Sequence, residues 1–185
     1  FDVSLVEIDD NVFEVIATGG DTFLGGDDFD SRIINYLITK FKTDTNIDLP
    51  RDKLIIQRLT NAAEIAKCEL SQAQSTTINI PYITYNDNKP VDLLVTLDRQ
   101  KLIELIEDLV QKTIDICDSI LMEKRLTIFD VNDVLITGGQ TRMPFIQELL
   151  SKHFKKKVCK FTNPDTAVAI GCALFSSAID RFDSY

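Results

Sequence analysis

The sequence has few residues that bind metals and few positive charges for its length. It contains a single histidine, His153, and four cysteines without C-x-x-C spacing, so zinc-type clusters are excluded. Twenty Lys and Arg stand against 29 Asp and Glu, which gives a net charge of -9. A field of that sign repels nucleic-acid backbones and anionic membrane surfaces. The longest apolar run, residues 168–175, is too short to span a bilayer.

The lack of a cysteine pairing pattern bears on the compartment in which the protein works. The cysteines are Cys68, Cys117, Cys159 and Cys172. We expect reduced and mostly buried thiols, and therefore a reducing compartment. The chain starts with Phe1 inside a strand-like run and shows no signal peptide, so we expect it to be a fragment of a longer protein.

What the sequence does contain is typical of a folded domain. Hydrophobic residues make up 44% and charged residues 26% of the 185 residues, which favours one globular domain or two small ones. Apolar periodicity predicts two hairpins, three helices and a final β-α-β-α unit. The predicted segments are strands 1–8 and 12–18, helices 29–46 and 52–73, strands 76–84 and 91–97, a long helix after Asp98, a short buried strand 133–137, a tight loop 138–142, a helix from Pro144, a strand 158–161, and a last helix capped by Asn163-Pro164-Asp165.

The order of these segments predicts a mixed α/β fold. Residues 26–100, roughly, contain two helices and a hairpin of their own. We therefore expect this stretch to be an insertion between two parts of one sheet layer.

The Gly-Gly turn after residues 133–137 is the strongest candidate for a ligand site. Gly138 and Gly139 at the carboxyl end of a strand let the backbone approach a ligand, and the helix from Pro144 offers N–H donors. Arg142 suits stacking on a base or pairing with a carboxylate. The Lys-Ser/Thr pair of a Walker loop is absent. The alternative is that the turn serves packing geometry alone.

Two further polar groups are candidates. Glu64, Lys67 and Ser71 are spaced i, i+3 and i+7, so they share one face of the second helix. The alternative for this stripe is a solvated helix face. Asp2 and the Gly25-Gly26-Asp27-Asp28 turn are suited to hold a metal or position water, and the alternative for the turn is helix-cap chemistry.

Five segments, in this order and spacing, carry a resemblance to a known family. They are FDVSLVEI (1–8), GDTFLGGDDFD (20–30), EIAKCELSQA (64–73), LITGGQTRMP (135–144) and NPDTAVAIGCA (163–173). Together they resemble the second lobe of the ATPase domain of the heat-shock protein 70 family, most closely its DnaK-like branch. The resemblance implies an actin-like, ribonuclease-H-like α/β lobe with an inserted α+β subdomain. Residues 1–25 and 101–185 would form subdomain IIA, and residues 26–100 subdomain IIB.

The same resemblance implies a nucleotide site. Its residues would be Glu64, Lys67 and Ser71 around the ribose and base; Gly138, Gly139, Gln140 and Arg142 on the adenine side, with Arg142 against the base; Asp165 beside the same pocket; Gly26 near the phosphates; and Asp2 as an accessory acidic residue beside the catalytic centre. Family members with Arg after the pocket Lys clamp the adenine from both sides. Cys68 stands at that place here, which implies a weaker clamp. The resemblance implies no metal ligand in this chain.

ATP or ADP is the cofactor that the resemblance implies, with Mg²⁺ in the full-length protein. In the family a phosphate-binding turn lies immediately before the residues that match Phe1, and the first lobe supplies the groups that position Mg²⁺ and the attacking water. Phosphoryl transfer depends on elements on several sides of the phosphates. We therefore expect the 185-residue chain to hydrolyse ATP negligibly and to bind nucleotide weakly, with little preference between ATP and adenosine.

The resemblance also implies partners. A GrpE-type exchange factor would bind residues 26–100, and a J-domain co-chaperone would bind the first hairpin, including Glu14 and Val15. The acidic residues of that hairpin, which suit a basic helix, are Glu7, Asp9, Asp10 and Glu14. Unfolded polypeptide would bind a separate domain that is absent here. The implied location is the bacterial cytoplasm or an organellar matrix.

Three alternatives remain open from the sequence. Within the family, an iron–sulfur-assembly chaperone of the HscA type is hard to separate from a general DnaK chaperone. A sugar kinase or filament protein of the actin superfamily would share the fold. A partner-binding module without a nucleotide role is the third alternative, and convergence of Lys67, Ser71 and Arg142 on one cleft would argue against it.

Overall fold

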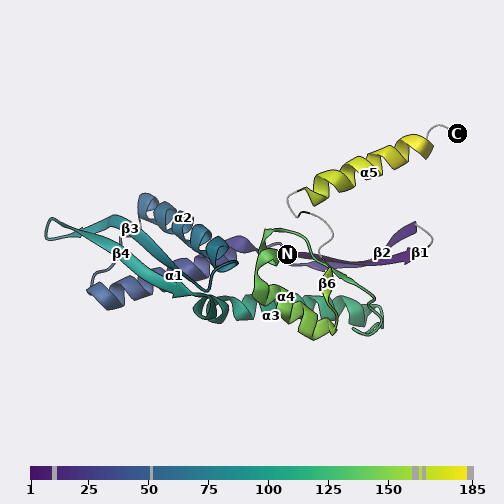
Figure 1. The fold of residues 1–185 in the computed structure, drawn as a ribbon, viewed down its shortest axis with the longest axis horizontal. Helices are drawn as coiled ribbons and strands as arrows, with labels where there is room; N and C mark the ends of the chain where they lie inside the picture. The colour runs from purple at the N-terminus through teal and green to yellow at the C-terminus, as the bar shows by residue number, and fades with distance from the viewer. Residues whose placement is uncertain (10–11, 51, 160–162, 164–165, 183–185) are drawn as a thin grey trace. The chain divides into compact units, whose positions relative to one another are not determined.

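The computed structural model describes residues 1–9, 12–50, 52–159, 163 and 166–182. The chain divides into two units, Phe1–Arg125 and Leu126–Tyr185, which are described separately below. Figure 1 shows the elements of each unit in chain order.

The first unit begins with the predicted hairpin. Strands β1 (Asp2–Asp9) and β2 (Val12–Gly20) pair antiparallel, which confirms the prediction. Leu5 pairs with Ala17 but the next residue, Val6, pairs with Val15, so β2 carries a bulge.

The base of this hairpin packs on the long helix α3 (Arg99–Glu123). A Cβ atom built on Gly19 would lie 2.7 Å from the Cγ2 atom of Ile120, a distance that real Cβ atoms do not show. Glycine at this position therefore lets β2 approach α3 more closely than any other residue would allow.

The middle of the unit consists of two helices and a second hairpin. Helix α1 runs from Gly26 to Thr45 and α2 from Lys53 to Leu70, and strands β3 (Ser75–Asn86) and β4 (Lys89–Asp98) pair antiparallel. Buried side chains of α1, α2, α3 and the two strands form the core. The most completely buried are Ile33, Leu37, Leu59, Leu70, Leu93, Leu97, Leu102, Ile106 and Val110.

Helix α2 ends three residues earlier than predicted. We predicted that it runs to Ala73, but its last residue is Leu70. The guanidinium of Arg99 donates hydrogen bonds to the carbonyl oxygens of Leu70 (2.8 Å) and Ala73 (2.7 Å). These carbonyls are therefore satisfied by a side chain from the start of α3, and the helix does not continue.

The second unit contains the β-α-β-α elements of the prediction. They are β5 (Val134–Leu135), the 3₁₀-helix η1 (Gly139–Arg142), α4 (Pro144–Phe154), β6 (Val158–Cys159) and α5 (Ala167–Phe182), with β5 parallel to β6. The predicted tight loop is thus a 3₁₀ turn. The N-cap predicted at Asn163-Pro164-Asp165 falls partly outside the described residues, since Pro164 and Asp165 are not described.

Two predictions about burial were wrong. Strand β5 was predicted to be buried, but Leu135 is 64% exposed, because β6 is the one strand that pairs with β5 among the described residues. All four cysteines are unbonded, but only Cys117 is buried, and Cys68 and Cys172 are exposed. Cys68 directly follows two buried positions of α2, so the 100° step of the helix turns it toward solvent.

The described strands form three two-stranded sheets, β1–β2, β3–β4 and β5–β6. Together with the five α-helices of the described residues, they confirm the mixed α/β class. The assignment of residues 26–100 as an inserted subdomain stays a prediction. None of the helices in the described part of the chain is both long enough and apolar enough to cross a membrane.

Candidate functional site

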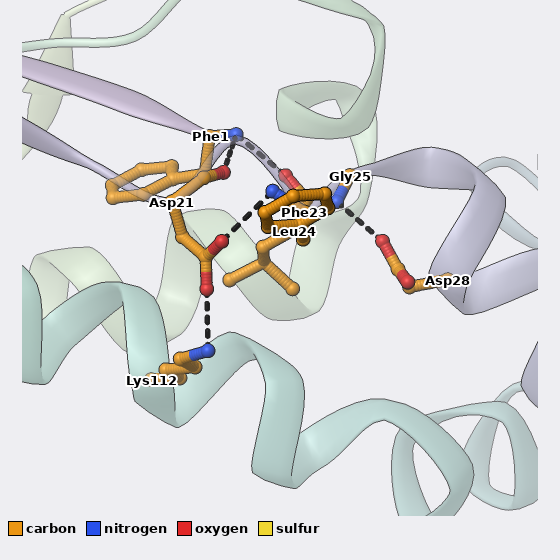
Figure 2. Close-up of polar contacts among 7 residues, drawn as sticks. All are labelled: Phe1, Asp21, Phe23, Leu24, Gly25, Asp28 and Lys112. Carbon is orange, nitrogen blue, oxygen red and sulfur yellow. Dashed lines mark hydrogen bonds and ion pairs between the residues drawn. The ribbon is translucent and has the colours of Figure 1, made fainter.

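The loop between β2 and α1 is held by polar contacts at both of its ends, as Figure 2 shows. The backbone nitrogen of Phe1 lies 3.0 Å from the carbonyl oxygen of Asp21 and 2.5 Å from that of Leu24. The Asp21 carboxylate accepts from the backbone N–H of Phe23 (2.8 Å) and from the ammonium of Lys112 on α3. These contacts fix the path of the chain into α1.

The Gly-Gly-Asp-Asp turn caps α1. The carboxylate of Asp28 accepts a hydrogen bond from the backbone N–H of Gly25 (2.8 Å), and the Asp28 N–H donates to the Gly25 carbonyl (3.2 Å). The helix-cap interpretation of this turn is therefore confirmed for Asp28. Among the described residues, no three His, Cys, Asp or Glu side chains lie close enough together to hold a metal ion.

Lys67 is buried, which makes the solvated-face alternative wrong for this residue. It is 5% exposed, and its Nζ atom lies 2.8 Å from Oδ2 of Asp30, which is 6% exposed. The same ammonium donates to the carbonyl oxygen of Gly26 at 3.1 Å. The structure thus brings together Lys67 and Gly26, two of the predicted site residues, although they are 41 positions apart.

The other two residues of the stripe lie on either side of Lys67 along α2. Glu64 is exposed, and Ser71 is half-buried at the C-terminal cap of the helix. The Ser71 hydroxyl donates to the Lys67 carbonyl at 3.3 Å. The three side chains therefore differ in burial: Lys67 is buried, Ser71 is half-buried and Glu64 is exposed.

Sequence reasoning missed Asp30. Its spacing to Ile33, Leu37 and Phe41 places it on the apolar stripe of α1, and all four residues are buried. A carboxylate on an apolar stripe requires a buried partner, so this spacing was a usable signal. Burial raises the pKa of the Asp30 carboxyl, and the Lys67 ammonium opposes that rise.

The loop that begins at Gly138 is a compact turn within the second unit. The Thr141 hydroxyl and N–H both donate to the Gly138 carbonyl (2.7 and 3.2 Å), and the Gln147 side chain donates to the Thr141 carbonyl (2.6 Å). Met143, directly after the turn, is 4% exposed and anchors it to α4. The predicted residues Gly138, Gly139, Gln140 and Arg142 therefore lie on one fixed 3₁₀ turn.

The two glycines of this turn have different reasons to be glycine. Gly138 has φ 92°, a left-handed conformation that other residues adopt only with strain. At Gly139, a built Cβ atom meets nothing within 4 Å among the described residues. Packing within the described chain therefore does not require glycine at 139, whereas backbone conformation does at 138.

The acidic residues of the first hairpin gather on one of its faces. Glu7 pairs with Glu14 and Asp9 with Val12 across the two strands, and these four residues line a hollow of about 360 Å³. The neighbouring Val15 pairs with Val6, and both are exposed. Asp10 lies outside the described residues, as does Asp165.

Asp2 lies at the other end of the hairpin. It is exposed and pairs with Gly20 at the start of β1. Since Lys67 and Ser71 belong to the first unit and Arg142 to the second, their convergence on one cleft stays a prediction.

Comparison with known proteins gives two matches that agree with each other. Residues 1–181 match the family described as Hsp70 protein. The chain is 51% identical over 178 residues to the Chaperone protein DnaK of Buchnera aphidicola subsp. Schizaphis graminum (strain Sg), and the match covers 94% of this chain. It covers 28% of that DnaK, so the chain spans less than a third of the relative's length. Because the family match extends over nearly the whole chain, the chain belongs to the Hsp70 family of ATP-binding chaperones.

Proposed function

We propose that the chain is the second lobe of a chaperone ATPase domain and binds the adenosine side of ATP or ADP. The observation that carries this proposal is the hydrogen bond from Lys67 Nζ to the Gly26 carbonyl at 3.1 Å. The resemblance implies that Lys67 lies beside the ribose and base and that Gly26 lies near the phosphates. One nucleotide can reach both residues only if they lie close together, and this hydrogen bond joins them.

Each implied residue has a role that its local structure suits. Glu64 and Ser71 present polar atoms near the end of α2, where a ribose hydroxyl or a base nitrogen would pair with them. Gly139, with open space in front of its Cα atom, would let a purine approach the backbone, and the exposed Arg142 would stack on the base. Gln140 and Gly138 shape the turn. Asp165 is included in the proposed site because the resemblance to the family implies that it lies beside the same pocket.

We expect the chain alone to bind nucleotide weakly and to hydrolyse it negligibly. The described residues offer donors on the adenosine side, whereas a triphosphate in hydrolysis needs groups around the phosphates, Mg²⁺ and the attacking water. Asp2 is proposed as an accessory acidic residue and not as the group that carries hydrolysis. In the full-length protein, the nucleotide state of the site would control binding of unfolded polypeptide by a separate domain.

Two partner surfaces follow from the same proposal. Residues 26–100, as subdomain IIB, would contact a GrpE-type exchange factor. The acidic face of the first hairpin, with Glu7, Asp9 and Glu14, would contact the basic helix of a J-domain. Val15 is exposed on the opposite face of the hairpin.

Shift mapping by NMR tests the site. We expect ADP added to the ¹⁵N-labelled chain to shift the backbone signals of Gly26, Glu64, Lys67 and Ser71 and of the 3₁₀ turn from Gly139 to Arg142. The variant Gly139→Ala keeps open space around the new methyl group, so it should fold normally and bind ADP more weakly. Shifts confined to the first hairpin, or the absence of any saturable shift, would overturn the proposal.

A further inference from the structure

Asp30 and Lys67 form a buried ion pair between α1 and α2. Nζ of Lys67 lies 2.8 Å from both oxygens of the Asp30 carboxylate, and the two side chains are 8% and 6% exposed for Asp30 and Lys67, respectively. Lys67 lies near the end of α2 and Asp30 near the beginning of α1, so the pair joins the start of one helix to the end of the other.

The buried side chains around the pair are apolar, and the nearby carboxylates of Asp27 and Glu64 are exposed. Phe29 and Ile33 flank Asp30 in the sequence pattern of α1, and Ala63, Ala66 and Leu70 flank Lys67 on α2; all of them are buried. Removing two charges from water costs free energy that their attraction seldom exceeds, and two apolar side chains would pack such a contact equally well. Packing therefore does not explain why this contact between the helices is charged.

The hydrogen bonds of the pair are incomplete. Among the described residues, Asp30 Oδ1 is a buried acceptor without a hydrogen bond of acceptable geometry, although the ammonium is close. Lys67 has three N–H donors, and three acceptors lie within 3.1 Å of its Nζ atom: the two carboxylate oxygens of Asp30 and the Gly26 carbonyl. The pair therefore holds the ammonium in one place.

That place is the first turn of α1. Without Asp30, the acidic groups that remain near the pair are those of Asp27 and Glu64, which are both exposed. The flexible side chain of Lys67 would then gain by turning toward solvent. Its hydrogen bond to Gly26 would then be lost. Asp30 thus connects the position of Lys67 to the position of the Gly26 backbone.

We propose that Asp30 is a positioning residue for nucleotide binding, which holds the Lys67 ammonium against the Gly26 carbonyl, beside the proposed adenosine site. This inference rests on the proposed function of Lys67. In this proposal Asp30 acts through Lys67 and does not itself contact the ligand.

Titration of the 185-residue chain with adenosine, followed by backbone NMR shifts, tests the inference with four variants. Lys67→Met removes the proposed contact, and Asp30→Asn removes the charge that positions it. Asp30→Glu keeps the charge on a longer side chain and serves if Asp30→Asn fails to fold. Ile33→Val is the matched control, since it trims a buried side chain next to Asp30 on the same helix and leaves both charges of the pair in place.

We expect Asp30→Asn to weaken adenosine binding about tenfold, the lower end of the loss seen when the groups that orient metal ligands are removed. Asp30→Glu should lie between this variant and the original chain, and Ile33→Val should bind as the original chain does. The ¹⁵Nζ signal of Lys67, visible when a buried ammonium exchanges its protons slowly, should disappear in Asp30→Asn and persist in Ile33→Val.

The outcomes separate the inference from the proposed function. Suppose that Lys67→Met weakens binding but Asp30→Asn binds as tightly as the original chain, or that Asp30→Glu does so where Asp30→Asn fails to fold. The positioning role of Asp30 is then wrong, and the proposed nucleotide site is unaffected. An equal loss of affinity in Ile33→Val and Asp30→Asn also overturns it, because the effect would then be one of general stability. If Lys67→Met binds normally, or the original chain does not bind adenosine, the proposed function fails and the inference fails with it.

Discussion

The carboxylate of Asp21 accepts a hydrogen bond from the ammonium of Lys112, 91 residues later in the chain. The contact ties the loop before α1 to the long helix α3, and Asp21 is largely covered, with 16% of its side chain exposed. The loop that leads to Gly26 therefore depends on a charge contact with a distant helix.

This contact predicts a shifted titration. The hydrogen bond from Lys112, followed by that from the Phe23 N–H, holds the pKa of Asp21 below its ordinary value of 3.8. A lowered carboxyl pKa stabilises the folded chain above the unfolded value, and the stabilisation is lost as the pH falls through the folded pKa. The variant Lys112→Gln should move the Asp21 titration upward toward its ordinary range, as measured from side-chain carboxyl NMR signals.

The control for this experiment is Lys53→Gln, at an exposed lysine at the start of α2. It should leave the titration of Asp21 unchanged. If Asp21 titrates identically in Lys112→Gln and in the original chain, the hydrogen bond from Lys112 is not what lowers its pKa.

Two glycines before α1, Gly20 and Gly25, should differ in how much stability the chain loses when each is replaced by alanine. A Cβ atom at Gly20 would lie 2.5 Å from the backbone carbonyl oxygen of Phe1, whereas at Gly25 it meets nothing within 4 Å among the described residues. Gly25 is also extended, with φ -166°, which any residue adopts. Gly20→Ala should therefore lower the free energy of unfolding by about 1–3 kcal/mol. Gly25→Ala should change it by less than about 0.5 kcal/mol.

Urea unfolding measures both variants under the same conditions. Equal destabilisation by the two substitutions would contradict the close approach of β2 to the first residue of the chain.

The cysteines should differ sharply in reactivity. Cys117 is buried on α3, and burial raises the pKa of its thiol to about 11, so almost none of it is thiolate at neutral pH. Cys68 and Cys172 are exposed. An aromatic disulfide reagent should label these two rapidly in the native chain and label Cys117 only after unfolding in urea.

The variant Cys117→Ser provides the comparison. It should show the same number of rapidly labelled thiols as the original chain and one fewer thiol in urea. Loss of a thiol from the rapid phase would show that Cys117 is accessible.

The pairing of Glu7 with Glu14 predicts opposite effects on stability and on partner binding. Like charges opposite each other in an antiparallel pair are unfavourable, so Glu14→Lys should stabilise the hairpin by about 0.2–1 kcal/mol. In the full-length protein, Glu14→Lys would reverse a charge on the proposed J-domain surface. It should therefore reduce J-domain-stimulated ATP turnover by about threefold or more.

Glu107→Lys, on the exposed side of α3, is the control for charge reversal away from the hairpin. It should leave the stimulation unchanged. If Glu14→Lys is stimulated as fully as Glu107→Lys, the acidic face of the hairpin is not the J-domain surface.

Local sequence signals predicted most of the helices and hairpins correctly. Helices were predicted to start at Asp52 and after Asp98, and α2 and α3 do start there. The carboxylates of Asp52 and Asp98 accept from the N–H groups of Ile55 (2.8 Å) and Lys101 (2.7 Å). Such signals act over three or four residues, so they are visible in the sequence without knowledge of the fold.

Contacts between distant residues were beyond the reach of these signals. The pairing of Asp30 with Lys67 spans 37 positions, and the capping of α2 by Arg99 spans 29. Each depends on how two elements pack, which periodicity does not specify. The same applies to β5, where an apolar run indicated burial but the number of neighbouring strands decided the exposure of Leu135.

The most direct test of the proposed nucleotide lobe is calorimetric titration of the 185-residue chain with adenosine, ADP and ATP, with and without Mg²⁺. We predict weak binding of similar strength for all three ligands, little effect of Mg²⁺, and a clear loss of affinity in Lys67→Met. Absence of saturable binding, or tight binding of ATP that depends on Mg²⁺, would contradict a site built on the adenosine side alone.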